Sequence, residues 1–212
     1  MTAPNACRKC DSPDTCRKCN SLEGHSQSAI RWPAHFLPGT TDNFVSNEVI
    51  VKGLTTRRVW DLLADISKWE CYYKNVSQIT APESGPVLEK GDVFKFSTFG
   101  FPVLTCSVEE SVPPPPTYAP ITRPCRVAWS AKLDAPSPEE SVEVYHAWLL
   151  EDLEGGRVRV LTQESQIGKP AAQLAGVKPN KMLLGHQDWL DGLVAAAMGQ
   201  NIGQTNLGAI EG

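Results

Sequence analysis

The chain has 212 residues, 41% of them hydrophobic and 21% charged, and a formal net charge of −4. This composition is typical of one globular domain with a well-filled core, and the charge balance excludes the broad basic surface that nucleic-acid binding needs. No apolar run reaches the roughly 18 residues of a membrane span, and the N-terminus lacks the apolar stretch of a secretory signal. We therefore expect a cytoplasmic protein with no membrane span, and a homodimer remains open.

The first segment, residues 1–42, is rich in Pro, Ser, Thr, Asn and Gly. It shows neither the two-residue period of strands nor the about 3.6-residue period of helices, so we expect a Cys-rich, flexible N-terminal arm. Alternation from Phe44 to Gly53 then predicts a first strand. Two short helices follow: Thr55 or Thr56 caps the first, and the second covers residues 67 to about 75.

The middle of the chain predicts further strands, separated by turn residues such as Gly155-Gly156. The alternating runs cover residues 92–98, 101–111, 126–133, 142–152 and 157–168. An apolar stripe over residues 179 to about 200 predicts a long C-terminal helix, and residues 201–212 are expected to form a disordered tail.

This order of elements indicates the α+β class. We expect a domain over residues 43–200, in which a curved antiparallel sheet of about seven strands wraps around the long helix. Such an arrangement leaves an internal space between sheet and helix.

Several short segments carry a resemblance to a known family. They are Val59-Trp60-Asp61-Leu62-Leu63 with Trp69, Lys90-Gly91-Asp92, Arg126-Val127-Ala128-Trp129, His146-x-Trp148-x-x-Glu151, and the run from Gly155-Gly156 to Gly168. In order and spacing the chain resembles the START-like (SRPBCC) superfamily of helix-grip proteins, and within it the polyketide cyclase/dehydrase and lipid-transport group. The resemblance implies a deep pocket for apolar or aromatic small molecules, in proteins that are either enzymes or carriers.

Alternation assigns side chains to the two faces of the predicted sheet. Arg157 and Arg159 are expected to face water, which places Glu164 on the inner face. The same reasoning places His146 and Trp148 on the inner face of the preceding strand.

Glu164 and His146 are therefore the first catalytic candidates. A carboxylate on an apolar wall beside an imidazole can perform general acid and base chemistry near neutral pH. The competing interpretation is a structural bridge between Glu164 and a polar neighbour. Tyr72 or Tyr73 is a candidate hydrogen-bond donor to a ligand carbonyl.

The other candidates are the remaining residues expected on the pocket wall. They are Trp148, Trp129, Trp69, Phe94, Phe96, Thr162, Gln166 and His186. For the tryptophans and for His186, an ordinary core position is the alternative.

Two functions remain open on the sequence. The first is a cofactor-independent enzyme, a cyclase, dehydratase or isomerase of secondary metabolism, acting on a polyketide-like or aromatic small molecule. The second is a non-catalytic binding or transport protein for an apolar ligand such as a lipid, quinone or polyketide.

The arm holds two Cys-x-x-Cys pairs, formed by Cys7, Cys10, Cys16 and Cys19. Four thiolates can hold a tetrahedral zinc ion, but the pairs are closer together than in zinc ribbons. Free thiols or disulfides are the alternatives. Apart from this zinc, no cofactor is expected, since no nucleotide-binding or hydrolytic metal motif occurs.

Overall fold

The computed structural model describes residues 27–121, 123–133 and 137–200. One compact unit begins at Trp32, and residues 27–31 belong to a separate unit. The four cysteines of the predicted arm and the predicted tail over residues 201–212 lie outside the described residues.

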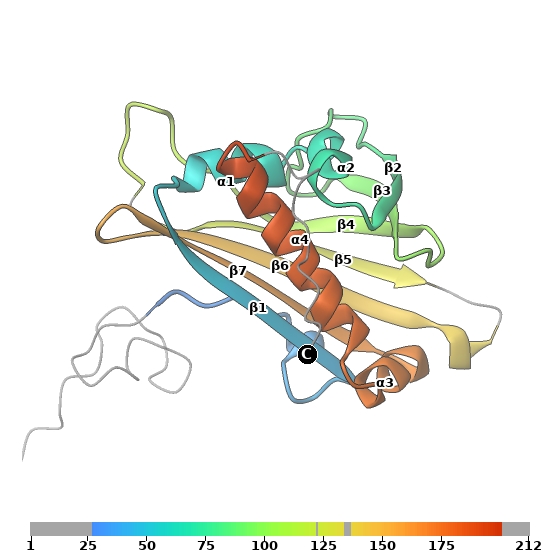
Figure 1. Ribbon diagram of the computed structural model, residues 1–212. Helices are drawn as coiled ribbons and strands as arrows, with labels where there is room; N and C mark the ends of the chain where they lie inside the picture. Colours follow the sequence, from blue (N-terminus) through green and yellow to red (C-terminus); the bar gives the residue numbers. More distant parts are fainter. Residues whose placement is uncertain (1–26, 122, 134–136, 201–212) are drawn as a thin grey trace, which may run out of the picture. The chain divides into compact units, whose positions relative to one another are not determined.

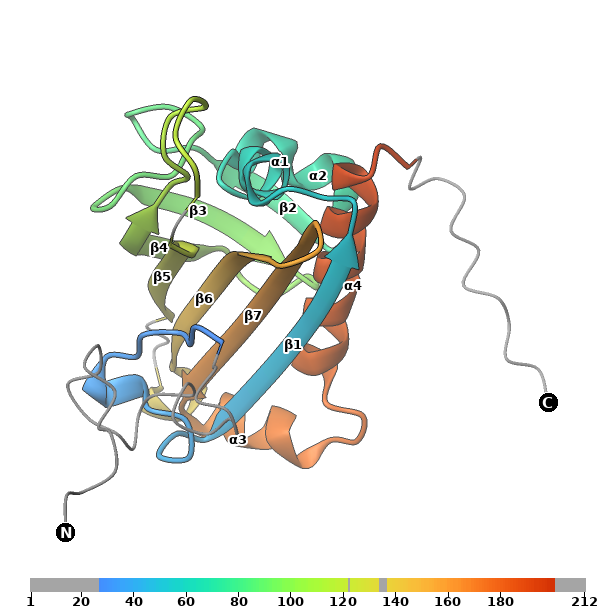
Figure 2. The same cartoon turned by 90° about the vertical axis from the view of Figure 1, so that its left-hand side faces the viewer.

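A seven-stranded sheet is the framework of the unit that begins at Trp32, and all of its strand pairs are antiparallel. Its strands are β1 (Asn43–Lys52), β2 (Val76–Thr80), β3 (Val93–Thr98), β4 (Leu104–Val112), β5 (Cys125–Leu133), β6 (Val142–Leu153) and β7 (Arg157–Ile167). Their order is β1-β7-β6-β5-β4-β3-β2. The sheet is curved, and its concave face turns toward the last helix (Figure 2).

Four α-helices accompany the sheet. They are α1 (Thr56–Leu63), α2 (Trp69–Tyr72), α3 (Lys169–Gly176) and α4 (Lys181–Ala197). The helix α4 crosses the concave face, with α1 and α2 near one of its ends and α3 near the other (Figure 1). This arrangement confirms the α+β class and matches a helix-grip-like fold. Among the helices that the structure describes, none is long and apolar enough to cross a membrane.

Side-chain caps mark the starts of α1 and α4. The Thr55 hydroxyl accepts a hydrogen bond from the backbone N–H of Arg58, 3.3 Å away, as predicted for a cap at this position. At the start of α4 the Asn180 side chain accepts from the N–H groups of Met182 and Leu183. Both caps satisfy backbone donors that have no partner within the helix.

Strand β2 and helix α3 were not predicted from the sequence. Only Val76 is buried in β2, which forms one edge of the sheet, so its sequence carries no alternation. In α3 only Ala171 is buried, and a proline stands in its first turn. Both elements have too little apolar surface to give a periodic signal.

The prediction that Arg159 faces water is wrong. Its side chain lies on the outer side of β7 but is fully buried. Its guanidinium donates to both carboxylate oxygens of Glu48, at 3.0 and 2.9 Å, and lies 3.4 Å from Glu151. A buried guanidinium requires such carboxylate partners, and strands β1 and β6 on either side of β7 supply them.

Residues before β1 also belong to this unit. The rings of Trp32 and Phe36 both pack against Tyr145 on the outer face of β6, each with a centroid distance of 5.6 Å. Trp32 also contacts Phe44 edge-on. The packed unit therefore includes residues ahead of the strand predicted from Phe44.

Helix α4 approaches α2 at a glycine. A methyl group added at Gly192 would lie 2.0 Å from the backbone carbonyl oxygen of Tyr72, which cannot move without shifting α2. We expect Gly192→Ala to lower the free energy of unfolding by about 3 kcal/mol or more, because overpacking against backbone forces the helices apart. Gly176→Ala is the matched control, since nothing lies within 4 Å of its added methyl group. Urea denaturation of both variants checks this, and equal stability of the two would contradict it.

Candidate active site

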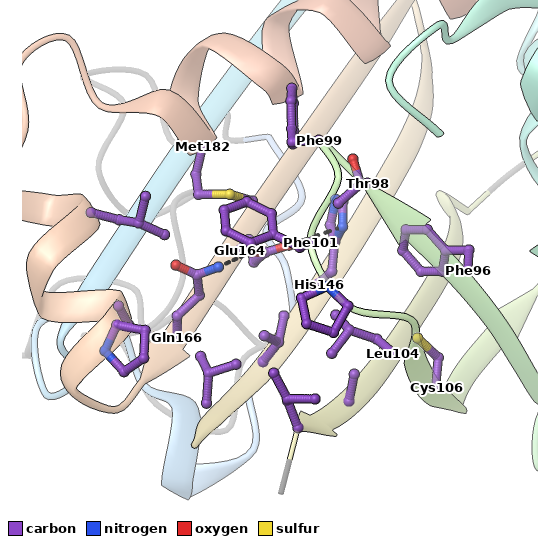
Figure 3. Close-up of a pocket in the computed structure, with 18 of the residues that line it drawn as sticks. Phe96, Thr98, Phe99, Phe101, Leu104, Cys106, His146, Glu164, Gln166 and Met182 are labelled. Carbon is purple, nitrogen blue, oxygen red and sulfur yellow. Dashed lines mark hydrogen bonds and ion pairs between the residues drawn. The ribbon is translucent and has the colours of Figure 1, made fainter. Parts of the chain in front are cut away.

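A cavity of about 230 Å³ lies between the concave face of the sheet and helices α3 and α4 (Figure 3). Its walls are mostly apolar and aromatic. The sheet contributes residues from β3 to β7, the β3–β4 loop contributes Phe99, Phe101 and Pro102, and α4 contributes Met182, His186 and Trp189. Clefts that bury drug-sized ligands span about 300–1,000 Å³, so this cavity suits a compact molecule.

Seven of the predicted site residues line this cavity. They are Tyr73, Phe96, Trp129, His146, Glu164, Gln166 and His186. The other five lie outside the lining and are buried in the adjoining core: Trp69, Tyr72, Phe94, Trp148 and Thr162. The inner face assigned by alternation is therefore correct, but the side chains differ in whether they reach the cavity.

Glu164 and His146 face each other across neighbouring strands. They are direct partners in the register of β6 and β7, and His146 Nδ1 lies 3.2 Å from Glu164 Oε2. His186 Nε2, from α4, lies 3.3 Å from the same oxygen. All three side chains are almost completely buried, so one carboxylate and two imidazoles share a site with little access to bulk solvent.

The protonation of this cluster follows from the contacts. A lone pair on either ring nitrogen would repel the carboxylate at these distances, so the favoured tautomers carry protons on the nitrogens that face Oε2. In that state the Thr162 hydroxyl donates to His146 Nε2, 2.8 Å away. Burial, and next the His186 ring, hold the pKa of His146 well below its ordinary value of 6.5, so its ring is neutral at pH 7.

A chain of amides holds the carboxylate from the other side. Gln166 Nε2 donates to Glu164 Oε1 over 2.6 Å, and Asn43 Nδ2 donates to Gln166 Oε1 over 2.7 Å. Asn180 Nδ2 in turn donates to Asn43 Oδ1 over 2.9 Å. Since Asn180 also caps α4, the position of Glu164 is linked to the start of the helix that carries His186.

Trp189 is the principal site residue that the sequence analysis missed. Its ring stacks on Tyr73 with a centroid distance of 4.5 Å. The centroids of Trp129, His146 and Trp148 lie 6.2, 5.5 and 5.5 Å from its own. Its spacing three residues after His186 places it on the same face of α4, and that signal was available. These contacts fix the ring orientations of the inner wall.

The two tyrosine candidates have different surroundings. The Tyr73 hydroxyl lies 3.0 Å from Thr98 Oγ1, and both residues line the cavity. The Tyr72 hydroxyl donates to the backbone carbonyl of Leu62 and lies outside the lining. Burial raises the pKa of both phenols above their ordinary value of 10.0, so each stays protonated at neutral pH and keeps an O–H that can donate.

The β3–β4 loop closes one side of the cavity. Phe99 adopts a positive φ of 53°, an uncommon conformation for a bulky residue. Its ring lies against Gly185 of α4, where an added methyl group would be 1.9 Å from Phe99 Cζ. Glycine at this position therefore lets the loop rest on the helix.

Three side chains of this cluster are also of the kinds that bind metal ions. The ligand atoms of His146, Glu164 and His186 lie within 4.8 Å of one another. The two imidazole rings, however, are stacked at 4.4 Å with an interplanar angle of 8°. Lone pairs in parallel ring planes cannot converge on one ion, so metal binding would require one ring to turn.

Proteins of known structure share this fold. The crystal structure of hypothetical protein jhp0584 from Helicobacter pylori shares 48% sequence identity with this chain at a TM-score of 0.74, covering 81% of this chain and 98% of that one. Protein MLL2253 from Mesorhizobium loti is 13% identical at a TM-score of 0.51, covering 74% and 97%, and shows the fold alone. No family model and no curated protein matches the chain.

The Zhui aromatase/cyclase from a Streptomyces species is a more remote neighbour. It is 15% identical at a TM-score of 0.49, covering 74% of this chain and 93% of that one. A likeness this distant carries no information about activity, because one fold supports many functions.

The buried neutral His146 predicts a pH dependence of stability. The pKa of His146 is lower in the folded than in the unfolded chain. Below about pH 6.5 the unfolded chain therefore binds a proton at this ring that the folded chain does not bind. Stability should therefore fall from pH 7 to pH 5.5, with a contribution from His146 of up to about 1.4 kcal/mol per pH unit. Chemical denaturation of His146→Gln should show a shallower slope than the wild type. An unchanged slope in His146→Gln would show that this ring is not the group responsible.

Proposed function

The chain belongs to the same family as hypothetical protein jhp0584 from Helicobacter pylori, and the name of that protein states no activity. We therefore propose a function from the site itself. The protein is a cofactor-independent enzyme of the cyclase, dehydratase or isomerase type that moves protons on a compact aromatic or polyketide-like molecule. The observation that carries this proposal is the Glu164 carboxylate, buried beside two imidazoles in an apolar cavity. The START-like resemblance of the sequence supports the same class.

Glu164 is the proposed base. It accepts a proton from a carbon next to a ligand carbonyl: the C–H bond breaks, an O–H bond forms on the carboxyl group, and the electron pair moves onto the carbonyl oxygen. The ring nitrogens of His146 and His186, 3.2 and 3.3 Å from Oε2, keep the carboxylate oriented before transfer. Returning the proton to another atom isomerises the ligand, and loss of hydroxide with the returning proton dehydrates it.

Tyr73 and Thr98 are the proposed donors to the developing oxyanion. Their hydroxyls lie 3.0 Å apart at the cavity wall, so either can turn an O–H toward a ligand oxygen. The ring wall of Phe96, Trp129 and Trp189 limits how a flat molecule lies against these groups. Predicted residues outside the lining, Tyr72 among them, support the wall and are not proposed to touch the ligand.

Solvent exchange tests the proposal without knowledge of the substrate. 2-Tetralone is neutral, compact and has acidic protons next to its carbonyl, so its deuterium exchange in D₂O can be followed by NMR. We expect the protein to accelerate this exchange, and Glu164→Gln to reduce the acceleration at least about 100-fold, since general acid–base catalysis contributes about 10²–10⁴-fold.

Equilibrium dialysis of the same ketone separates an enzyme from a carrier. Glu164→Gln should still bind 2-tetralone, because the apolar wall is unchanged. The matched control is Glu143→Gln, a half-exposed carboxylate paired with Lys132 at 3.6 Å, and it should exchange like the wild type. Saturable binding by the wild type with no acceleration of exchange would support the carrier function instead.

A further inference from the structure

One carboxylate oxygen of Glu164 can accept a further hydrogen bond. Oε2 faces ring nitrogens of both His146 and His186, whereas Oε1 accepts one hydrogen bond, from Gln166. An ionised carboxylate has about four acceptor positions. No other donor contacts Oε1 among the residues that the structure describes, so Oε1 can accept a further hydrogen bond from a ligand group that carries a proton.

Histidines apart, the charged side chains that line the cavity are all acidic. Among its described lining residues the ionisable groups other than histidine, tyrosine and cysteine are Glu140 and Glu164, and none is lysine or arginine. His146 is neutral, so it offers no counter-charge. An anionic ligand would have to leave water and lie near a buried carboxylate without a lysine or arginine to pair with, which costs several kcal/mol.

The walls add a limit on shape. Phe96, Phe99, Phe101, Trp129 and Trp189 surround the cavity with ring faces and edges. Its volume of about 230 Å³ is smaller than a typical drug-binding cleft. Flat molecules of one or two rings therefore match it best.

We propose that the pocket selects a neutral, flat hydroxyaromatic or enol ligand whose O–H donates to Glu164 Oε1, and that it rejects the corresponding carboxylates. This inference rests on the proposed function, because it uses the same carboxylate, and it names the class of substrate. Charge is rejected by Glu164, and the hydroxyl is selected by the acceptor position left on Oε1.

Three probes of one ring system test this selection by isothermal titration calorimetry at pH 7. 2-Naphthol is a neutral donor, 2-methoxynaphthalene lacks the donor, and 2-naphthoate carries a negative charge. We expect 2-naphthol to bind at least tenfold more tightly than 2-naphthoate and several-fold more tightly than 2-methoxynaphthalene. If 2-naphthoate binds as tightly as 2-naphthol or more tightly, the proposal is overturned. If 2-methoxynaphthalene binds as tightly as 2-naphthol, the proposed hydrogen bond from the ligand hydroxyl to Glu164 is wrong.

Two variants locate the source of the selection. Glu164→Gln removes the buried charge and should bring the affinities for 2-naphthol and 2-naphthoate within about threefold. Glu143→Gln removes a half-exposed acid outside the cavity lining, where solvent screens its charge, and should keep the wild-type ratio. A ratio lost in Glu143→Gln and kept in Glu164→Gln would overturn the assignment.

The wild-type series tests the ligand class even if a variant fails to fold. It also separates this inference from the proposed function, because it measures binding alone. Selection for 2-naphthol without accelerated exchange of 2-tetralone would support the ligand class and contradict the proposed catalysis. Accelerated exchange of 2-tetralone with a preference for 2-naphthoate would support the catalysis and contradict the ligand class.

Discussion

Burying a carboxylate in an apolar cavity costs free energy unless polar groups surround it. At Glu164 these groups come from the concave face of the sheet and from α4. Gln166 donates to one oxygen, and the ring nitrogens of His146 and His186 lie beside the other. These groups come from β6, β7 and α4. The surroundings of the charge therefore depend on strand register and helix position together, since a displacement of β6 or α4 would remove one of its partners.

The link between fold and site extends through Asn43 to Asn180. Asn180 uses its side-chain oxygen to cap α4 and its amide to hold Asn43, which orients Gln166. One residue thus fixes both the start of the helix and the far end of the amide chain. At Gly185 and Gly192 the helix lies close to Phe99 and to the backbone of Tyr72, which brings His186 and Trp189 against the sheet. Small residues on α4 are consequently as important for the site as the polar ones.

Much of this arrangement could be predicted from sequence, for an identifiable reason. Period-two alternation in β6 and β7 is regular, so it placed His146 and Glu164 on one face, and antiparallel pairing made them neighbours. The edge strand β2 and the short helix α3 bury too little to give a pattern. Arg159 was misplaced because alternation specifies a side of the sheet and not its exposure. The amide chain and the stacking of His146 on His186 depend on how α4 crosses the sheet, which no local pattern contains.

The cluster also bears on whether Glu164 is a structural bridge or a working carboxylate. A buried ion pair is weak evidence for stability, because apolar side chains of similar volume often serve folding equally well. Around Glu164 the described partners are an amide and two imidazoles, not a guanidinium or ammonium group. Arg159 shows the alternative in the same sheet, where a buried cation is matched by carboxylates on both neighbouring strands. The difference between the two sites favours function at Glu164, because this side chain has no lysine or arginine partner, one of its oxygens can accept a further hydrogen bond, and it lines a cavity.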